Sequence, residues 1–481
     1  MQIVSFAFIV FFAVTVTVYY LLPARVRYIW LFAASLFFYL SQGPVHTVFL
    51  AFSVCSTWIG ALFLEKHAEN GQRKKGILAA VLIANLAILL FFKYIGFLSG
   101  GLLRSPILPI GISFYLFQSI GYLIDVSRGT IKAERNPIRY ALFVTFFPTV
   151  LSGPIERGKN ILPQLQAAGL AEVRPDAGRI RDGMMRMLWG YFCKMVLADR
   201  IGIAVGAVYA SPASYGGAVL FLTSVLYTFQ IYLDFAGYSS IAVGAAKVLG
   251  IRVMENFDAP YLAENVRDFW RRWHISLSTW FRDYLYIPLG GNRRGRGRKL
   301  VNLMIVFLVS GLWHGAGFPF LIWGLLHGLY QVLGELWKPI GDRLTAKLSG
   351  EGGEGRTVRI LKVVWTFLLV NFAWIFFRMD TLSGALAVFR GFAHPRVWQL
   401  FDGTILTAGV NAAEWRLVLL GLGLVIMADI LHRCGKSVSD WITKQSLFIR
   451  WPILIAGIVV ILVCGVWGSG YDAASFIYYK F

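Results

Sequence analysis

The chain of 481 residues is 57% hydrophobic and only 15% charged, and a soluble protein with this balance would expose more apolar surface than water tolerates. Lysine and arginine number 46 against 25 acidic residues, for a formal charge of +21, but the basic residues gather in short segments between apolar runs. That pattern is typical of cytoplasmic loops beside anionic lipid and argues against nucleic-acid binding, so the composition predicts a polytopic membrane protein.

Apolar runs long enough to cross a bilayer core recur along almost the entire chain. The first, from Ile3 to Leu22, has no basic segment before it and no small-residue cleavage site after it, so we expect a transmembrane span and not a signal peptide. A stretch at 140–151 is too short to cross and predicts a re-entrant element. The runs together predict an all-α protein with about 12 transmembrane helices. Their expected positions are 3–22, 28–42, 45–64, 76–99, 107–126, 184–208, 217–248, 300–314, 318–337, 358–377, 416–432 and 451–469.

The order of basic and apolar segments predicts how the chain is oriented. The basic loops, of which 252–299 is the longest, should face the cytoplasm, and the connections with fewer basic residues should face the periplasm. We therefore expect a bacterial inner-membrane protein with both termini in the periplasm, built as a single transmembrane domain over 1–481. The glycine-rich segment 350–356 predicts a flexible cytoplasmic linker. The four cysteines lie far apart without ligand spacing, so we expect no metal site and no disulfide.

Residues 267–299 do not have the composition of a span and predict a cytoplasmic interfacial helix followed by a basic loop. On a helical period, one face is aromatic and the other carries Arg271 and Arg282, as is typical of a helix that lies at the membrane interface. His274 lies beside the aromatic face, and a titratable ring directed towards the protein interior indicates a function. A helix that lies on the membrane and has only a structural role would show the same amphipathic pattern.

The apolar run that begins at Val301 ends in Trp313-His314-Gly315, directly before the next run. An imidazole between two apolar runs is costly unless it is hydrogen-bonded or faces a cavity, and a neighbouring glycine lets backbone or substrate come close to it. His314 is therefore the leading catalytic candidate, and the ordinary alternative is a core histidine bonded to a carbonyl. His327, inside the next run, has the weaker claim and is expected to be structural.

Three polar residues interrupt other apolar segments: Gln230, Asp234 and Glu156. A carboxylate within the membrane is expensive, so Asp234 needs a partner, for which we expect an arginine. We expect both acids to hold the walls of the protein together by such pairing. The sequence contains no GxSxG elbow, HEXXH motif, P-loop or GxGxxG loop, which leaves histidine chemistry inside a membrane.

The segments WRRWHISLSTWFRDYLYIPLGGNRRG and LVSGLWHGAG resemble the signature of the membrane-bound O-acyltransferase superfamily, and YTFQIYLDFAGYS and PTVLSGPIER strengthen this resemblance. More narrowly, YIPLGGN at 286–292 and the aromatic segment at 476–479 are similar to the bacterial alginate O-acetyltransferase branch. The resemblance implies a ring of tilted spans around a central partition that is pierced by a tunnel. It also implies His314 as the catalytic histidine, His274 as a second motif histidine, and a soluble periplasmic acetyltransferase-like or esterase-like partner.

We therefore expect acyl transfer, with acetyl as the group, from a cytoplasmic thioester to an exopolysaccharide such as alginate or a related cell-envelope polymer. The donor would be acetyl-CoA or an acyl-carrier phosphopantetheine, with no tightly bound cofactor. His314 would take the proton of the acceptor hydroxyl, and Asn302, Trp313 or backbone N–H groups near Gly315 would stabilise the oxyanion. Two alternatives stay open: D-alanyl transfer to teichoic acid from an acyl-carrier protein, and a transporter or flippase, whose mark would be inverted repeats.

Overall fold

The structure is a computed structural model of residues 1–481, and it describes the chain except for residues 101, 104–106, 167–169, 171–172, 350–354 and 468–481. The side chains of 342–349 and of residue 407 also lie outside this description. Most of the expected linker 350–356 and the aromatic segment 476–479 therefore fall outside the described residues. Within them the secondary structure is helical, apart from one antiparallel bridge between Phe257 and Trp273, which confirms the all-α prediction.

The chain forms two compact units. Unit 1 comprises Met1–Tyr191 and Gly237–Glu255, and unit 2 comprises Phe192–Ala236 and Asn256–Tyr471, described as far as residue 467. The long helix α11 (Gly217–Val248) contributes residues to both units.

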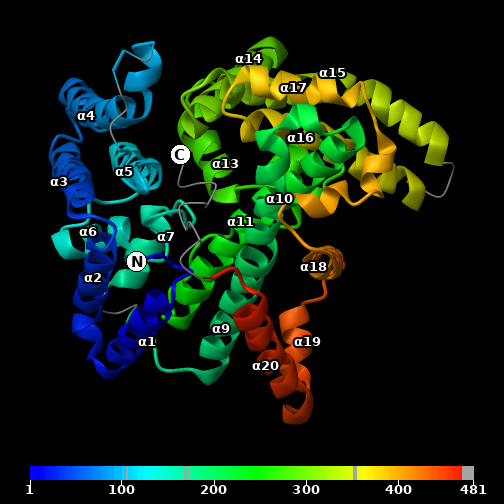
Figure 1. Ribbon diagram of the computed structural model, residues 1–481. Helices are drawn as coiled ribbons and strands as arrows, with labels where there is room; N and C mark the ends of the chain where they lie inside the picture. The colour runs from blue at the N-terminus through cyan, green and yellow to red at the C-terminus, as the bar shows by residue number, and fades with distance from the viewer. Residues whose placement is uncertain (101, 104–106, 167–169, 171–172, 350–354, 468–481) are drawn as a thin grey trace. The chain divides into compact units, whose positions relative to one another are not determined.

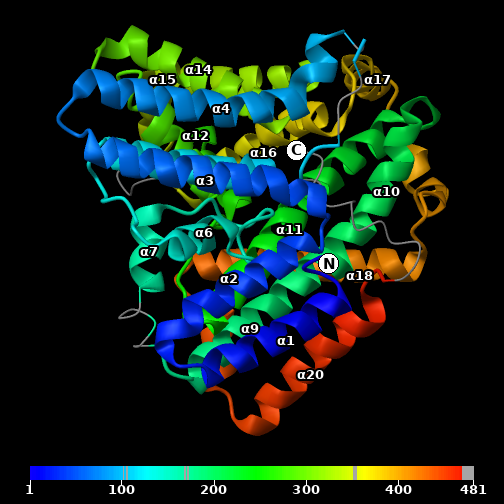
Figure 2. The ribbon, with the colours of Figure 1, turned by 90° about the vertical axis from the view of Figure 1, so that its left-hand side faces the viewer.

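Unit 1 contains eight further described helices, coloured blue to green in Figure 1, and the long helices α3 and α4 run side by side in Figure 2. Helix α5 is buried along almost its whole length and forms the core of this unit. Arg27 of α2 fastens the N-terminal helices, because its guanidinium donates hydrogen bonds to the carbonyls of Leu170 and Val173 at 3.1 and 2.6 Å. The helices are α1 (Phe6–Leu21), α2 (Ala24–Leu40), α3 (Pro44–Lys66), α4 (Gly71–Leu98), α5 (Ile112–Ser127), α6 (Pro137–Thr145), α7 (Gly158–Leu165) and α9 (Ala177–Tyr191).

Unit 2 begins with a π-helical turn and contains the hairpin of α14 and α15, which pack closely along each other. Its elements are η1 (Phe192–Ala198), α10 (Asp199–Ala210), η2 (Pro212–Ser214), η3 (Pro260–Leu262), α12 (Val266–Arg272), α13 (Ile275–Phe281), η4 (Arg282–Tyr286), α14 (Gly295–His314), α15 (Phe318–Ser349), α16 (Arg356–Arg378), α17 (Leu382–Phe392), η6 (Val397–Leu400), η7 (Thr404–Thr407), α18 (Ala412–Arg433), α19 (Val438–Lys444) and α20 (Leu447–Cys464).

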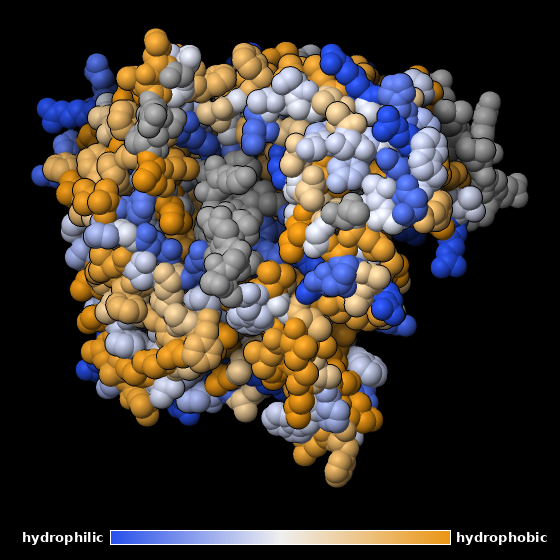
Figure 3. Space-filling view, in the orientation of Figure 1, coloured by the Kyte–Doolittle hydropathy of each residue, from blue (hydrophilic) through white to orange (hydrophobic). Residues whose placement is uncertain are grey.

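Six helices of the described chain are long and apolar enough to cross a membrane: α3, α4, α11, α16, α18 and α20. Apolar side chains cover much of the face shown in Figure 3, as expected of a surface that contacts lipid. The remaining predicted spans coincide with helices that are shorter, such as α1 and α5 with 16 residues each, or more polar. The protein is thus a multi-pass membrane protein, while the number of about 12 crossings stays a prediction.

One sequence-based assignment of a single helix is wrong. The expected interfacial helix from residue 267 is broken into α12 and α13, because Trp273 is extended and pairs with Phe257. The run at 184–208 is helical throughout, and within it the π-helical turn η1 buries Lys194; whether this run crosses the membrane stays a prediction. The short stretch at 140–151 contains only the nine-residue helix α6 and a buried turn, so it is too short to cross, as predicted.

Candidate functional site

His314 is the last residue of α14, at the point where the α14–α15 hairpin turns. Glycines let the two helices approach closely, since a Cβ at Gly311 would overlap the carbonyl oxygen of Phe320 and a Cβ at Gly324 would overlap that of Phe307. The ring of Phe320 fills the space beside Gly315 in the same way. The position of His314 therefore depends on backbone-to-backbone packing that only glycine permits.

Aromatic rings surround the buried imidazole of His314, which is 2% exposed. The ring centroids of Trp313, Trp323 and Phe377 lie 4.8, 5.0 and 5.1 Å from the centroid of His314, each at a steep interplanar angle. Such edge-to-face contacts fix the ring plane. The imidazole also lies at the C-terminal end of α14, where the helix dipole has its negative end.

His274 is held in a different way, by a short antiparallel ribbon formed by residues 256–258 and 272–275. Ile275 N–H donates to the carbonyl of Asn256 at 3.0 Å, and Asp258 N–H donates to the carbonyl of Arg272 at 3.1 Å. His274 itself has φ 44° and ψ 55°, a left-handed conformation that a non-glycine residue adopts only where its surroundings enforce it. Its ring is completely buried, and burial lowers the pKa of His274 to about 3.

The structure brings all three predicted histidines into one aromatic cluster within unit 2. Trp313 lies between His274 and His314, with ring centroids 6.2 and 4.8 Å away, and Trp323 contacts both His314 and His327 at 5.0 Å. The indole N–H of Trp270 donates to Nδ1 of His327 at 3.1 Å. An indole only donates, so this hydrogen bond leaves the proton of a neutral His327 on Nε2 and gives the ring a clear packing role.

The supporting residues predicted from sequence lie in varied surroundings. Asn302 donates from its amide to the carbonyl of Gly291 at 3.1 Å and so holds the loop that precedes α14. Gln230 packs against Gly202 of α10. The partner of Asp234 is Lys194 and not the expected arginine: the ammonium lies 2.6 Å from the carboxylates of Asp234 and Asp199, and all three side chains are at most 6% exposed.

The basic residues before α14 are not all available to a ligand. Glu335 of α15 forms ion pairs with Arg267 and Lys299, which ties α12 and the start of α14 to the second helix of the hairpin. Arg282 pairs with its neighbour Asp283 at 2.8 Å while 60% of its side chain stays exposed. Arg271 is exposed, and no ion pair reaches it within the part of the chain that the structure describes.

Glu156 lies in unit 1, in the loop before α7 and outside the candidate spans. Its carboxylate is 1% exposed and accepts a hydrogen bond from the backbone N–H of Met254. Burial raises the pKa of Glu156 to about 7, although this hydrogen bond and the adjacent Arg157 act in the opposite direction. Because Glu156 and the histidines belong to different units, its expected role in the walls of the protein stays a prediction.

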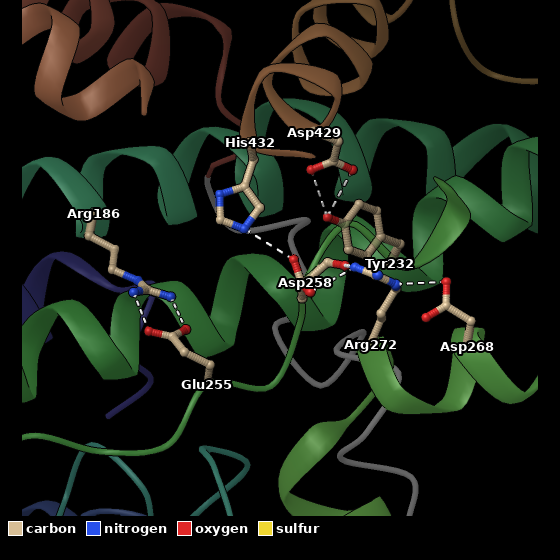
Figure 4. A network of polar contacts seen from close by, with 8 residues as sticks. All are labelled: Arg186, Tyr232, Glu255, Asp258, Asp268, Arg272, Asp429 and His432. Atoms are coloured by element: carbon tan, nitrogen blue, oxygen red, sulfur yellow. Dashed lines mark hydrogen bonds and ion pairs between the residues drawn. The ribbon is translucent and has the colours of Figure 1, made fainter. Parts of the chain in front are cut away.

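A polar network that the sequence did not reveal fastens α18 to the histidine ribbon (Figure 4). Asp429 and His432 lie one helical turn apart on α18; Asp429 accepts a hydrogen bond from the hydroxyl of Tyr232 at 3.1 Å, and His432 lies 3.1 Å from Asp258. Arg272 binds the same Asp258 at 2.7 Å. Figure 4 also shows Arg186 paired with Glu255 in unit 1. Within the described residues no group of three or more His, Cys, Asp or Glu side chains is placed to hold a metal ion.

The sequence model of the membrane-bound O-acyltransferase family matches residues 132–351, which include both motif histidines. A probable alginate O-acetylase of Pseudomonas putida is 36% identical over 406 residues, which cover 82% of this chain and 80% of that protein. A peptidoglycan O-acetyltransferase of Helicobacter pylori is 34% identical over 76% of this chain and 73% of its own. A teichoic acid D-alanyltransferase of Bacillus subtilis is 29% identical over 66% of this chain and 80% of its own. The chain therefore belongs to the membrane-bound O-acyltransferase family.

Proposed function

We propose that this enzyme moves an acetyl group from a cytoplasmic thioester to a hydroxyl of a cell-envelope polysaccharide, such as alginate, on the periplasmic side of the inner membrane. The main observation in support of acyl transfer by a general base is the position of His314, a buried imidazole at the end of α14 inside an aromatic cluster. The acceptor class rests on the relatives, since an alginate O-acetylase and a peptidoglycan O-acetyltransferase both resemble this chain over about three quarters or more of its length.

In the proposed step His314 takes the proton of the acceptor hydroxyl, and the resulting oxygen nucleophile attacks the carbonyl carbon of the thioester. The carbon–oxygen bond forms, the carbon–sulfur bond breaks, and the thiolate leaves with the proton that the imidazolium returns. The helix-end position supports this role, because the negative end of the dipole favours the transient imidazolium. The oxyanion would be stabilised by the indole of Trp313 or by backbone N–H groups that follow Gly315, since the N–H of Gly315 donates to the carbonyl of Gly311 and the amide of Asn302 is bonded to the loop.

Donor binding is assigned to the exposed cations before α14. CoA and phosphopantetheine both carry phosphate, which guanidinium groups bind well. Arg271 is exposed and outside the Glu335 ion pairs, and Arg293, Arg294 and Arg298 are exposed as well, which supports a cytoplasmic donor site here. The same basic segment supports a cytoplasmic placement for the start of α14 and, with the alternation of basic loops, periplasmic termini.

D-alanyl transfer to teichoic acid is the alternative, supported by the relative in Bacillus subtilis. We propose acetyl transfer because the acetyl-transferring relatives are more similar and match a larger part of this chain. A soluble periplasmic acetyltransferase-like partner would complete delivery to the polymer.

The test is a deletion strain complemented with the wild-type gene or with His314→Ala. Mild alkali releases ester-linked groups from the isolated envelope polymers, and mass spectrometry identifies them. We expect the deletion and His314→Ala to lose polysaccharide-linked acetate, with restoration by the wild-type gene. Loss of D-alanine in place of acetate would overturn acetyl transfer in favour of the alternative, and unchanged amounts of both would refute the proposed function.

A further inference from the structure

The side-chain oxygen of Asn256 is the centre of the contacts that hold the turn at His274. It accepts hydrogen bonds from the hydroxyl of Ser276 at 2.7 Å and from the backbone N–H of Ser276 at 3.3 Å, and it lies 3.4 Å from Nδ1 of His274. Asn256, Ser276 and His274 are each at most 1% exposed. No sequence motif singled out Asn256, and the general base proposed above is a different residue.

The orientation of the Asn256 amide follows from its partners. A backbone N–H only donates, so the atom that faces Ser276 must be the oxygen Oδ1 and not the amide nitrogen. The same oxygen lies 3.4 Å from Nδ1 of His274, and because an amide oxygen only accepts, a hydrogen bond across this contact requires the proton on Nδ1.

The protonation of the rest of the ring then follows from its charge. Complete burial disfavours the imidazolium and lowers the pKa of His274 to about 3, so the ring is neutral at physiological pH. A neutral imidazole has one N–H and one lone pair. With the proton on Nδ1, the lone pair is on Nε2.

We propose that Asn256 is a positioning residue that fixes His274 as the Nδ1–H tautomer, with Nε2 presented as a hydrogen-bond acceptor in the aromatic cluster beside Trp313. This inference rests on the proposed function for its consequence: Nε2 of His274 would orient the acceptor hydroxyl while His314 removes its proton. The left-handed backbone at His274 fits this role, because residues held in such conformations concentrate at functional sites.

The tautomer is tested directly and without acyl transfer. The protein contains seven histidines, so selective ¹⁵N-histidine labelling gives a tractable long-range ¹H–¹⁵N correlation spectrum, in which His274 is assigned by the signals missing in His274→Ala. We expect the wild-type protein and Asn256→Asp to show the Nδ1–H pattern at His274, because aspartate keeps an acceptor oxygen at this place. Loss of that pattern is expected in Asn256→Ala. An Nε2–H pattern in the wild-type protein would overturn the proposal even if acetyl transfer is established.

The proposed effect of Asn256 on catalysis through His274 is tested by measuring turnover in four proteins: wild type, Asn256→Ala, His274→Ala and the double variant. We expect Asn256→Ala to lower kcat about tenfold, and by no more than His274→Ala does, because Asn256 acts only by orienting that ring. If Asn256 acts through His274, the double variant is no slower than His274→Ala alone. A further loss of similar size in the double variant would show a merely structural role and overturn the proposal.

Two controls separate positioning from folding. Ser276→Ala removes another hydrogen bond to the same oxygen without touching His274, and we expect it to affect thermal unfolding as Asn256→Ala does while keeping most of the turnover. Asn256→Asp should rescue most of the turnover and raise the pH of the acidic limb of the kcat profile, since a carboxylate beside the ring stabilises its charged form. If Asn256→Asp is as slow as Asn256→Ala and its pH profile is unchanged, the positioning role is wrong.

Discussion

Alanine in place of Gly311 is expected to slow the enzyme by displacing His314. The new methyl group would lie 3.2 Å from the carbonyl carbon of Phe320, closer still to its oxygen, and 3.3 Å from the Cα of Gly324. These are backbone atoms of α15, so no side chain can rotate away. The overlap is relieved only if α14 and α15 move apart by an amount of the order of 1 Å, and a misplacement of that size costs about a hundredfold in rate.

The cost in stability should leave the protein folded. Overpacking of this kind destabilises by about 1–3 kcal/mol. Gly334→Ala is the matched control, because the same substitution on α15 meets no atom within 4 Å. It should be neutral or stabilising, since alanine favours a helix over glycine by about 1 kcal/mol.

The assay measures the initial rate of acetyl transfer in liposomes, with acetyl-CoA as donor and the envelope fraction of the deletion strain as acceptor. Thermal unfolding and donor binding are measured in detergent. Gly311→Ala should bind donor and remain folded yet transfer acetyl far more slowly than Gly334→Ala. A Gly311→Ala protein with the wild-type rate would refute the claim that glycine packing places the catalytic ring.

Three other predictions address charge and topology. Arg271→Gln should raise the donor KM about two- to fivefold, the scale of one exposed charge pair, with little change in kcat and a smaller effect at high salt. Arg267→Gln should instead lower stability, because it breaks an ion pair with Glu335. If Arg271→Gln and the wild type have the same donor KM, Arg271 is not part of the donor site. A cysteine at Arg298, in a background without native cysteines, should react with an impermeant thiol reagent only after spheroplasts are lysed, and labelling of intact spheroplasts would contradict the orientation. Burial raises the pKa of Glu156 to about 7, above its unfolded value near 4.5, so its contribution to stability is present below about pH 4.5 and is lost as the pH rises through 7. Glu156→Gln should therefore unfold at a temperature that falls less between pH 5 and pH 8 than that of the wild type, and parallel pH curves would show that Glu156 is ionised without penalty.

Sequence patterns predicted the helical class, the membrane location and the candidate histidines, because apolar length and an imidazole between apolar runs are local properties. The break between α12 and α13 was missed, since aromatic residues at helical spacing also fit two short helices around an extended Trp273. The partner of Asp234 was missed for another reason: Lys194 is far away in sequence, and only the tertiary fold brings its ammonium to the carboxylate.

The positioning contacts were the least predictable part of the site. Asn256 lies in a segment without helical or strand periodicity, and its importance follows only from the hydrogen bonds that converge on its oxygen. Asp258 and His432 likewise meet across a long stretch of sequence. The glycines of the WHGAG segment indicated close packing beside His314. The tight spacing of α14 and α15, however, is set by Gly311 and Gly324, which the sequence analysis did not single out.

The central claim is tested most directly by the rate of acetyl transfer of purified His314→Ala in the liposome assay. We expect this protein to fold, insert and bind donor like the wild type and to transfer acetyl at least about a hundredfold more slowly, the scale of losing a general base. His274→Ala should keep partial activity, and His327→Ala should be the mildest of the three. A His314→Ala protein that transfers acetyl at nearly the wild-type rate would contradict the proposed mechanism, although membership of the family would stand.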